Sequence, residues 1–425
     1  MAPARTPNRR GAPARPGAVS YRLVADEAAL EALIGEILAG EEYGLDTEFH
    51  RERTYYPRLA LLQVAFADQI ALIDPQAVDV APFAAVLTSP ALAVVHAADQ
   101  DLEVLERACG AVPGRLFDTQ LAAGFDGLST PALGTLVERV LNLRLEKGDQ
   151  LTDWTRRPLS ERQLAYAASD VAYLLTLKRQ IIERLERLGR LAWAEEECAA
   201  LLARPRGPVV PEEAWWRLKH VRQLRGRERQ VAQAVAAWRE RRAQRLDVPT
   251  RYVLSDLALV SIAHRPPGDR GELEAVRGID VRGLGGGALA ELLDAISEGT
   301  AMSPDQVRMP PGPPAEPVAR PAAALGAAWV SSRARELGID TSLLATRADL
   351  AAFFKERPEG RLTVSWRNEL VGEPLRRLAE GALALAVGAR GDLVLEERSH
   401  RPVSADGKAP GGSGQELRPG ASEPI

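Results

Sequence analysis

Glu42-Tyr-Gly-Leu-Asp-Thr-Glu-Phe-His-Arg-Glu-Arg53 is the stretch that decides the fold of the N-terminal half of this chain. Its side chains alternate with the period of a β-strand, so Asp46 and Glu48 would project from the same face. Neighbouring carboxylates repel each other and are poor strand formers, which suggests that a cation neutralises the pair. Oxygen ligands favour magnesium or manganese. The alternative is a solvated face on an edge strand, and the rest of the chain must decide between the two.

Length and composition limit the possible classes of protein. The chain has 425 residues, of which 46% are hydrophobic and 26% are charged, enough for two or three globular domains. No apolar run approaches the roughly 20 residues that cross a bilayer, so we expect no membrane association. The two cysteines, Cys109 and Cys198, provide neither a disulfide framework nor a zinc cluster. They fit a reducing interior, and we expect a cytoplasmic protein.

The first 18 residues carry four arginines, four prolines and no acid, and they lack the apolar core of a signal peptide. We interpret residues 1–18 as a disordered basic tail. A first domain is expected over residues 19–205. It begins with a helix over 26–39, followed by the acidic strand within 42–53, strands over 59–66 and 70–73, a buried strand over 91–95, and a strand near 115–117 among further helices. Hairpin strands followed by strand–helix alternation predict an α/β fold with a mixed sheet covered by helices.

Two further acidic signals follow the buried strand. Asp99 is a natural helix N-cap, and Asp101 lies in the same helix start. Capping and the helix dipole account for Asp99 but leave Asp101 free. Because the C-terminal end of a buried strand commonly opens on the ligand crevice, we expect Asp101 near the rim of an active site.

The last acidic signal lies on a helix that begins after a capping box of Ser160 and Gln163. Tyr166 and Asp170 are spaced i,i+4 and share a helix face away from the apolar stripe. Taken alone, the tyrosine could be core and the aspartate solvated surface.

Together these residues resemble the tyrosine-bearing branch of the DEDD exonuclease superfamily, and the finer matches resemble ribonuclease D. The matching segments include Gly44-Leu-Asp-Thr-Glu-Phe49, His96-Ala-Ala-x-x-Asp101-Leu-Glu-Val-Leu, Phe117-Asp-Thr119, Lys147 followed by Asp153-Trp154, and Arg157-Pro-Leu-Ser-x-x-Gln163-Leu-x-Tyr166-Ala-x-x-Asp170-Val. The resemblance implies a ribonuclease H-like exonuclease domain that trims RNA from the 3′ end and releases nucleoside 5′-monophosphates. Precursors of tRNA with 3′ extensions are the implied substrates, and no stable protein partner is predicted.

The chemistry of such a site follows from its ligands. Four converging carboxylates can hold two divalent ions roughly 4 Å apart, which stabilise the attacking and leaving oxygens of a displacement at phosphorus. The family implies that Asp46 bridges the ions, that Glu48 and Asp170 complete one of them, and that Asp101 serves the other. Tyr166 would orient the attacking water. Two alternatives stay open: an exonuclease acting mainly on DNA, and a nucleic-acid-binding protein without activity.

The composition changes beyond residue 205. Residues 204–245 carry twelve Lys or Arg against four acids, a local charge of +8 that is typical of nucleic-acid-binding surfaces. Segments within 211–299 resemble the HRDC domain, an all-α module. We expect Arg222, Arg225 and Arg229, spaced i, i+3 and i+7, to contact RNA from one helix face. Alternatively, the domain is only a spacer with solvated arginines.

Residues 300–321 are rich in proline and predict a linker. A second all-α unit is expected over 322–390, and its runs Leu343-Leu-Ala-Thr-Arg347 and Trp366-Arg367 resemble a diverged HRDC module. Residues 391–425 are predicted to be a disordered tail.

Overall fold

The structure is a computed structural model that describes residues 17, 19–146, 152–219, 221–279, 285–310, 319–355 and 360–399. The chain divides into two compact units, Met1–Pro313 and Pro314–Ile425. Of the predicted basic tail, only Gly17 is among the described residues. Most of the predicted C-terminal tail, residues 400–425, also lies outside them.

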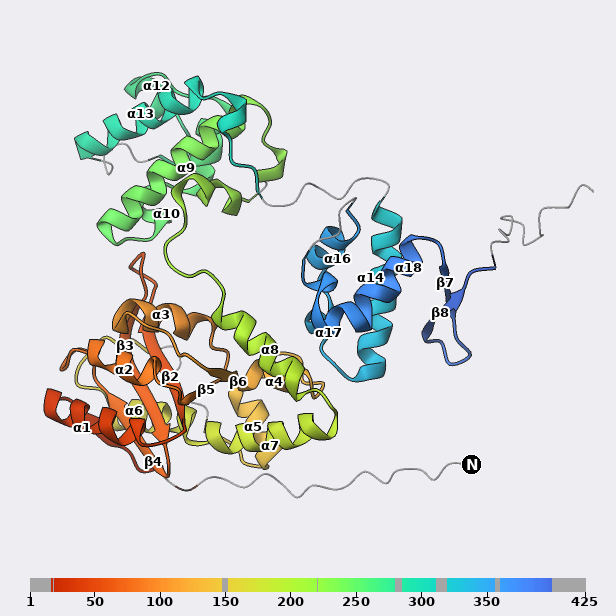
Figure 1. Cartoon of the computed structure of the whole chain (residues 1–425). Coiled ribbons are helices and arrows are strands. Elements are labelled where there is room, and N and C mark those ends of the chain that lie inside the picture. The colour runs from red at the N-terminus through yellow and green to blue at the C-terminus, as the bar shows by residue number, and fades with distance from the viewer. Residues whose placement is uncertain are drawn as a thin grey trace, which may run out of the picture. The chain divides into compact units, whose positions relative to one another are not determined.

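A six-stranded mixed sheet forms the centre of the first domain (Figure 1). Its spatial order is β1-β4-β3-β2-β5-β6, and β3 runs antiparallel to β2 and β4 while the other pairs are parallel. The predicted α/β fold is confirmed, and one edge strand, β1, was not predicted. The strands are β1 (Arg22–Val24), β2 (Glu42–His50), β3 (Arg58–Phe66), β4 (Gln69–Ile73), β5 (Leu92–Val95) and β6 (Leu116–Asp118).

Helices cover both faces of this sheet. They are α1 (Glu27–Leu38), η1 (Ala81–Phe83), α2 (Ala84–Leu87), α3 (Asp99–Cys109), α4 (Thr119–Gly124), α5 (Leu133–Leu141), α6 (Glu161–Ala172), α7 (Leu174–Arg187) and α8 (Leu191–Leu202). On β3, Leu62 belongs to the core that contains residues of α1 and α3, while its neighbour Leu61 belongs to a second core with residues of α6. Alternation along the strands therefore directs successive side chains into different cores.

The helix starts show how local sequence sets these elements. The Ser160 side chain accepts from the N–H of Gln163 and the Gln163 side chain accepts from the N–H of Ser160, which confirms the predicted capping box. The prediction that Asp99 caps α3 is wrong. The N-cap position is Ala98, whose N–H donates to Asp118, and Asp99 instead pairs with Arg204 at 3.3 Å. No side chain of the described residues caps the start of α3, and Asp118 at the end of β6 accepts from the N–H groups of Ala97 and Ala98 just before the helix.

The helical region that follows is built around the long helix α9 (Arg227–Leu246). The other elements are η2 (Pro211–Arg217), η3 (Val221–Gln223), α10 (Thr250–Val253), α11 (Asp256–His264), α12 (Arg270–Glu274), α13 (Gly285–Ala301) and η4 (Pro304–Gln306). A Cβ atom added to Gly299 of α13 would stand 2.7 Å from Cα of Val231, so only glycine allows the two helices to approach so closely. The predicted linker begins too early, because Gln233 of α9 bonds to both Gln306 and Arg308.

The connection between β2 and β3 binds this helical region through polar contacts. The Tyr55 hydroxyl donates to Glu240 at 2.5 Å, and Asp247 accepts from the Tyr56 N–H at 3.1 Å and from Arg58 at 2.8 Å. Burial and the bond to Glu240 raise the pKa of Tyr55 to about 12, so the phenol stays protonated. A cavity of about 770 Å³ lies beside this junction and does not include the acidic residues predicted for catalysis.

The second unit is mostly helical and ends in a two-stranded hairpin. Its elements are α14 (Ala319–Leu337), α15 (Thr341–Leu344), α16 (Arg347–Phe353), η5 (Arg361–Thr363), α17 (Ser365–Arg367), the π-helical η6 (Asn368–Gly372), α18 (Glu373–Ala379), β7 (Leu383–Val387) and β8 (Leu393–Glu397). The prediction of disorder from residue 391 onward is wrong for β8, which pairs antiparallel with β7. Gly391 adopts a positive φ of 79° in the turn, and the apolar residues after it complete the hairpin.

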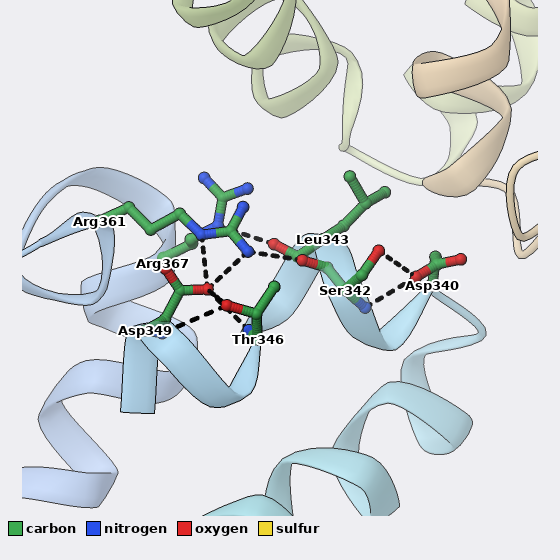
Figure 2. A network of polar contacts seen from close by, with 7 residues as sticks. All are labelled: Asp340, Ser342, Leu343, Thr346, Asp349, Arg361 and Arg367. Carbon is green, nitrogen blue, oxygen red and sulfur yellow. Dashed lines mark hydrogen bonds and ion pairs between the residues drawn. The ribbon is translucent and has the colours of Figure 1, made fainter. Parts of the chain in front are cut away.

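A polar network joins the two short runs that suggested a diverged HRDC module (Figure 2). Arg361 donates to Asp349 at 2.7 Å and to the carbonyl of Ser342 at 2.6 Å, and Arg367 donates to the carbonyl of Leu343 at 2.7 Å. Thr346 and Asp349 form a reciprocal capping box at the start of α16. These arginines therefore have a structural role in satisfying backbone carbonyls near a helix end.

Among the described residues, no helix is both long enough and apolar enough to cross a membrane.

Candidate active site

Three of the predicted acids converge from two elements of the first domain. Asp46 and Glu48 lie on β2, and Asp170 lies on α6, which packs over β2, β3 and β4. One carboxylate oxygen from each of the three lies within 4.8 Å of the others. All three side chains are half-buried. The predicted strand period therefore brings Asp46 and Glu48 to the same place as an acid more than a hundred residues away.

Asp101 approaches from the other side of β2. It lies in the first turn of α3, is 7% exposed, and its Oδ1 accepts from the Thr47 hydroxyl at 2.5 Å. β5 pairs with β2 only from Glu42 to Gly44, so the later part of β2 has no partner on that side and α3 can approach it. The sequence predicted Asp101 near the rim of an active site, and the structure buries it beside the cluster.

Burial and mutual repulsion disfavour the ionised form of the four carboxyl groups, those of Asp46, Glu48, Asp101 and Asp170. Burial raises the pKa of Asp46 well above its ordinary value, and the charges of Asp101, Asp170 and Glu48 raise it further. Burial, then Asp170 and Asp101, raise the pKa of Glu48 to about 8. Burial also raises the pKa of Asp101 and of Asp170 to about 7. Within the described part of the chain, no lysine or arginine forms an ion pair with any of them. Such a set of oxygens fits divalent cations.

Tyr166 lies one helical turn before Asp170 and is hydrogen-bonded to it, which holds the pKa of Asp170 lower than burial alone would. The tyrosine ring is half-buried and lies 6.0 Å from the ring of Trp154, centroid to centroid. It also packs against the core under α6. Tyr166 therefore combines the two roles that its sequence context left open: its ring belongs to the edge of a core, and its hydroxyl belongs to the acidic cluster.

Two residues of the site were missed by the sequence analysis. Thr47 lies between the two predicted acids and holds Asp101. Gln63 of β3 is 0% exposed and directly opposite Asp46 in the antiparallel register. The sequence did contain a signal for Gln63, because it is the single polar residue within the apolar run Leu59–Phe66.

The predicted arrangement of Arg222, Arg225 and Arg229 on one helix face is wrong. Arg222 lies in η3, Arg225 lies between elements, and only Arg229 lies in α9. The helix cannot run through because Gly226 adopts a φ of 43° and a ψ of −123°, which are not helical. Both Arg225 and Arg229 donate to the carbonyl of Leu224.

Much of the local positive charge in residues 204–245 is paired with acids. Arg239 is buried and pairs with Asp256 at 2.7 Å, and Arg242 and Arg245 share Glu291 at 3.1 Å each. Arg204 pairs with Asp99 and Arg241 with Glu212. The sequence count of +8 therefore overstates the charge available to a phosphate backbone.

Comparison with known proteins defines the class. Residues 21–186 match a family model described as 3′–5′ exonuclease, and residues 228–296 match the HRDC domain. The acidic cluster lies within the first of these segments. The chain is therefore a 3′–5′ exonuclease with an HRDC domain.

Individual relatives identify the family. Ribonuclease D of Acidiphilium cryptum is 38% identical over 379 residues, covering 87% of this chain and 95% of that protein. Ribonuclease D of Escherichia coli K12 is 32% identical over 381 residues, covering 85% and 99%. The crystal structure of E. coli RNase D, described as an exoribonuclease involved in structured RNA processing, superposes with a TM-score of 0.77 at 32% identity and covers 85% of this chain and 99% of that one.

This chain belongs to the ribonuclease D family, and its enzyme class is that of a 3′–5′ exoribonuclease. The family implies the use of divalent metal ions, which agrees with the cluster of acids, and an RNA substrate. The alternatives of a DNA-directed exonuclease and of an inactive binding protein are not supported.

Proposed function

We propose that the protein trims the 3′ ends of RNA at the site formed by Asp46, Glu48, Asp101 and Asp170, which would hold two Mg²⁺ or Mn²⁺ ions. The observation that supports this most directly is the proximity of three carboxylates within 4.8 Å, with no cationic side chain paired to them in the described residues. Ions bound there would make a water nucleophilic and neutralise the charge that develops on the leaving oxygen.

The four acids would contribute unequally. One oxygen of Asp46 lies within 4.8 Å of an oxygen of Glu48 and of Asp170. We propose that Asp46 would be a ligand of both ions, with Glu48 and Asp170 as ligands of one and Asp101 as a ligand of the other. Thr47 would fix Asp101 by donating to one of its oxygens, which leaves the other oxygen free to act as a ligand.

Tyr166 would position the attacking water. Its phenolic hydroxyl can both donate and accept a hydrogen bond, so it could hold a water beside the ions. The bond to Asp170 places its hydroxyl beside one of the proposed ligands. Its ring lies beside that of Trp154, at 6.0 Å between the centroids.

We further propose that tRNA precursors with 3′ extensions are substrates, that nucleoside 5′-monophosphates are the products, and that the enzyme acts in the cytoplasm. Both cysteines are buried and unpaired, which supports a reducing compartment. Arg222, Arg225 and Arg229 stay candidates for RNA contacts, in a segment before α9 and at its start instead of along one helix face.

Digestion of 5′-labelled RNA and DNA oligonucleotides of matched sequence tests this function. We expect RNA to shorten from its 3′ end in Mg²⁺ or Mn²⁺, with 5′-monophosphates as products and no reaction in EDTA. Asp101→Asn should abolish trimming. The matched control is Asp99→Asn, an exposed acid in the same helical turn, which should leave trimming intact. Equal activity in EDTA, or full activity of Asp101→Asn, would refute the proposal.

A further inference from the structure

Gln63 is a buried polar side chain without a visible structural reason. It is 0% exposed, and neither Nε2 nor Oε1 has a hydrogen-bond partner among the described residues. Buried amide groups are almost always hydrogen-bonded, because an unpaired one loses its water without compensation. The rest of the strand from Leu59 to Phe66 is apolar, so leucine or methionine would fill this position at lower cost.

The register of the sheet places Gln63 beside the acidic cluster. It is the direct cross-strand partner of Asp46 on β2 and of Leu72 on β4. Directly opposite residues on antiparallel strands project from the same face, with Cβ atoms about 4.5–5.5 Å apart. A glutamine at this position has the length to reach the carboxylate of Asp46.

The helix above Gln63 also belongs to the site. Leu61 on the same strand and Leu72 on the next pack in the core with Ala167 and Ala168 of α6. Residues 61 and 63 share a strand face, so Gln63 lies in the layer between the sheet and α6. α6 carries Tyr166 and Asp170. The Gln63 amide is therefore enclosed between the strand and the helix that supply three of the four acids.

We propose that Gln63 is a positioning residue for Asp46: when divalent ions are held at the site, its Nε2 donates to the Asp46 carboxylate and fixes the orientation of that ligand. This inference rests on the metal-dependent function proposed above. Ligating carboxylates are commonly hydrogen-bonded by a supporting group, and loss of that group typically weakens metal affinity about 10–100-fold. The bond would also give the amide the partner that it lacks in the described structure.

The test uses Gln63→Met in the full-length protein, because methionine keeps the length and removes both polar atoms. The matched control is Leu72→Met, which changes the other neighbour of Gln63 in the same layer, on the side away from Asp46. Isothermal titration calorimetry with Mn²⁺ measures affinity, thermal unfolding in EDTA measures the stability of the metal-free protein, and steady-state kinetics separate kcat from KM for an RNA oligonucleotide.

We expect Gln63→Met to weaken Mn²⁺ binding about tenfold or more, to lower kcat at limiting Mn²⁺ with KM for RNA unchanged, and to unfold in EDTA at the wild-type temperature or above. Leu72→Met should bind Mn²⁺ like the wild type. A merely structural glutamine predicts the opposite pattern: a lower unfolding temperature in EDTA with Mn²⁺ affinity unchanged, and that result would overturn the inference.

Asp46→Asn separates this inference from the function on which it rests. If Asp46→Asn abolishes Mn²⁺ binding while Gln63→Met preserves it, only the role of Gln63 is wrong. If Asp46→Asn binds Mn²⁺ like the wild type, the metal site itself is wrong. Should Gln63→Met not fold, a crystal structure of the wild-type protein with Mn²⁺ decides: Nε2 within about 3.2 Å of an Asp46 oxygen supports the inference, and a longer separation overturns it.

Discussion

Replacing Asp46 by asparagine is expected to stabilise the metal-free protein while abolishing its nuclease activity. The variant keeps the shape of the side chain and removes one of the charges that lie within 4.8 Å of each other. Two unit charges at this distance interact by about 0.9 kcal/mol at the dielectric constant of water and by about 3.5 kcal/mol at an effective value of 20. Because the side chains are half-buried, we expect a gain of about 1–2 kcal/mol in the free energy of unfolding.

The sign does not depend on how the folded protein accommodates the cluster. At neutral pH the unfolded carboxyl groups are ionised, whereas the folded site either keeps the repulsion or takes up protons, as the raised pKa of Asp46 indicates. Both responses cost free energy that asparagine avoids. For domains of 150–250 residues, 1 kcal/mol corresponds to about 2–4 °C in the unfolding temperature.

Thermal unfolding in EDTA and in Mn²⁺ measures both halves of this prediction. The wild type should unfold at a higher temperature in Mn²⁺, because ligand binding stabilises the folded state by mass action. Asp46→Asn should unfold at a higher temperature than the wild type in EDTA and gain little from Mn²⁺. Asp99→Asn is the control for removal of an exposed acid and should show neither effect. If Asp46→Asn is less stable than the wild type in EDTA, the electrostatic reasoning is refuted.

Three further predictions concern catalysis, stability and RNA binding. Tyr166→Phe should lower turnover on the order of 10²-fold with metal and RNA binding largely unchanged, and an unchanged single-turnover rate would make the hydroxyl irrelevant to catalysis. Burial would raise the pKa of Asp74, but hydrogen bonds from Arg157 and Gln76 outweigh burial and hold that pKa low. Asp74→Asn should therefore lose about 2–4 kcal/mol in the free energy of unfolding at pH 7. Denaturant titrations should show this difference from the wild type shrinking as pH falls below ~4. Replacing Arg222, Arg225 and Arg229 together by glutamine should flatten the slope of log RNA affinity against log salt concentration by up to roughly three units. A wild-type salt dependence would assign these arginines to solvated surface.

Sequence periodicity and helix capping determined much of the candidate site. The strand period alone placed Asp46 and Glu48 on one face, and the capping box set the start of α6, from which Tyr166 and Asp170 follow one turn apart. These features depend on neighbours within a few residues, so they can be predicted from the chain. The order of the motifs along the chain then sufficed to suggest the family.

The same local reasoning failed wherever a distant contact decided the outcome. Asp118 holds the turn before α3, where Asp99 was expected as the cap, and the backbone of Gly226, with a φ of 43° and a ψ of −123°, interrupts the helix expected to carry the three arginines. The hairpin at β8 needed β7 as a partner before its composition could form a strand.

The environment of the acids was likewise decided only by the tertiary structure. Burial of Asp101 against Thr47 and the pairing of Gln63 with Asp46 come from the approach of α3 to β2 and from the register between β2 and β3. The local backbone sets the direction of each side chain, so the spacing of residues along a strand or helix predicts which side chains share a face. Burial, pairing and the resulting pKa shifts are set by whichever segments the whole core brings together, and no spacing within a single segment encodes them.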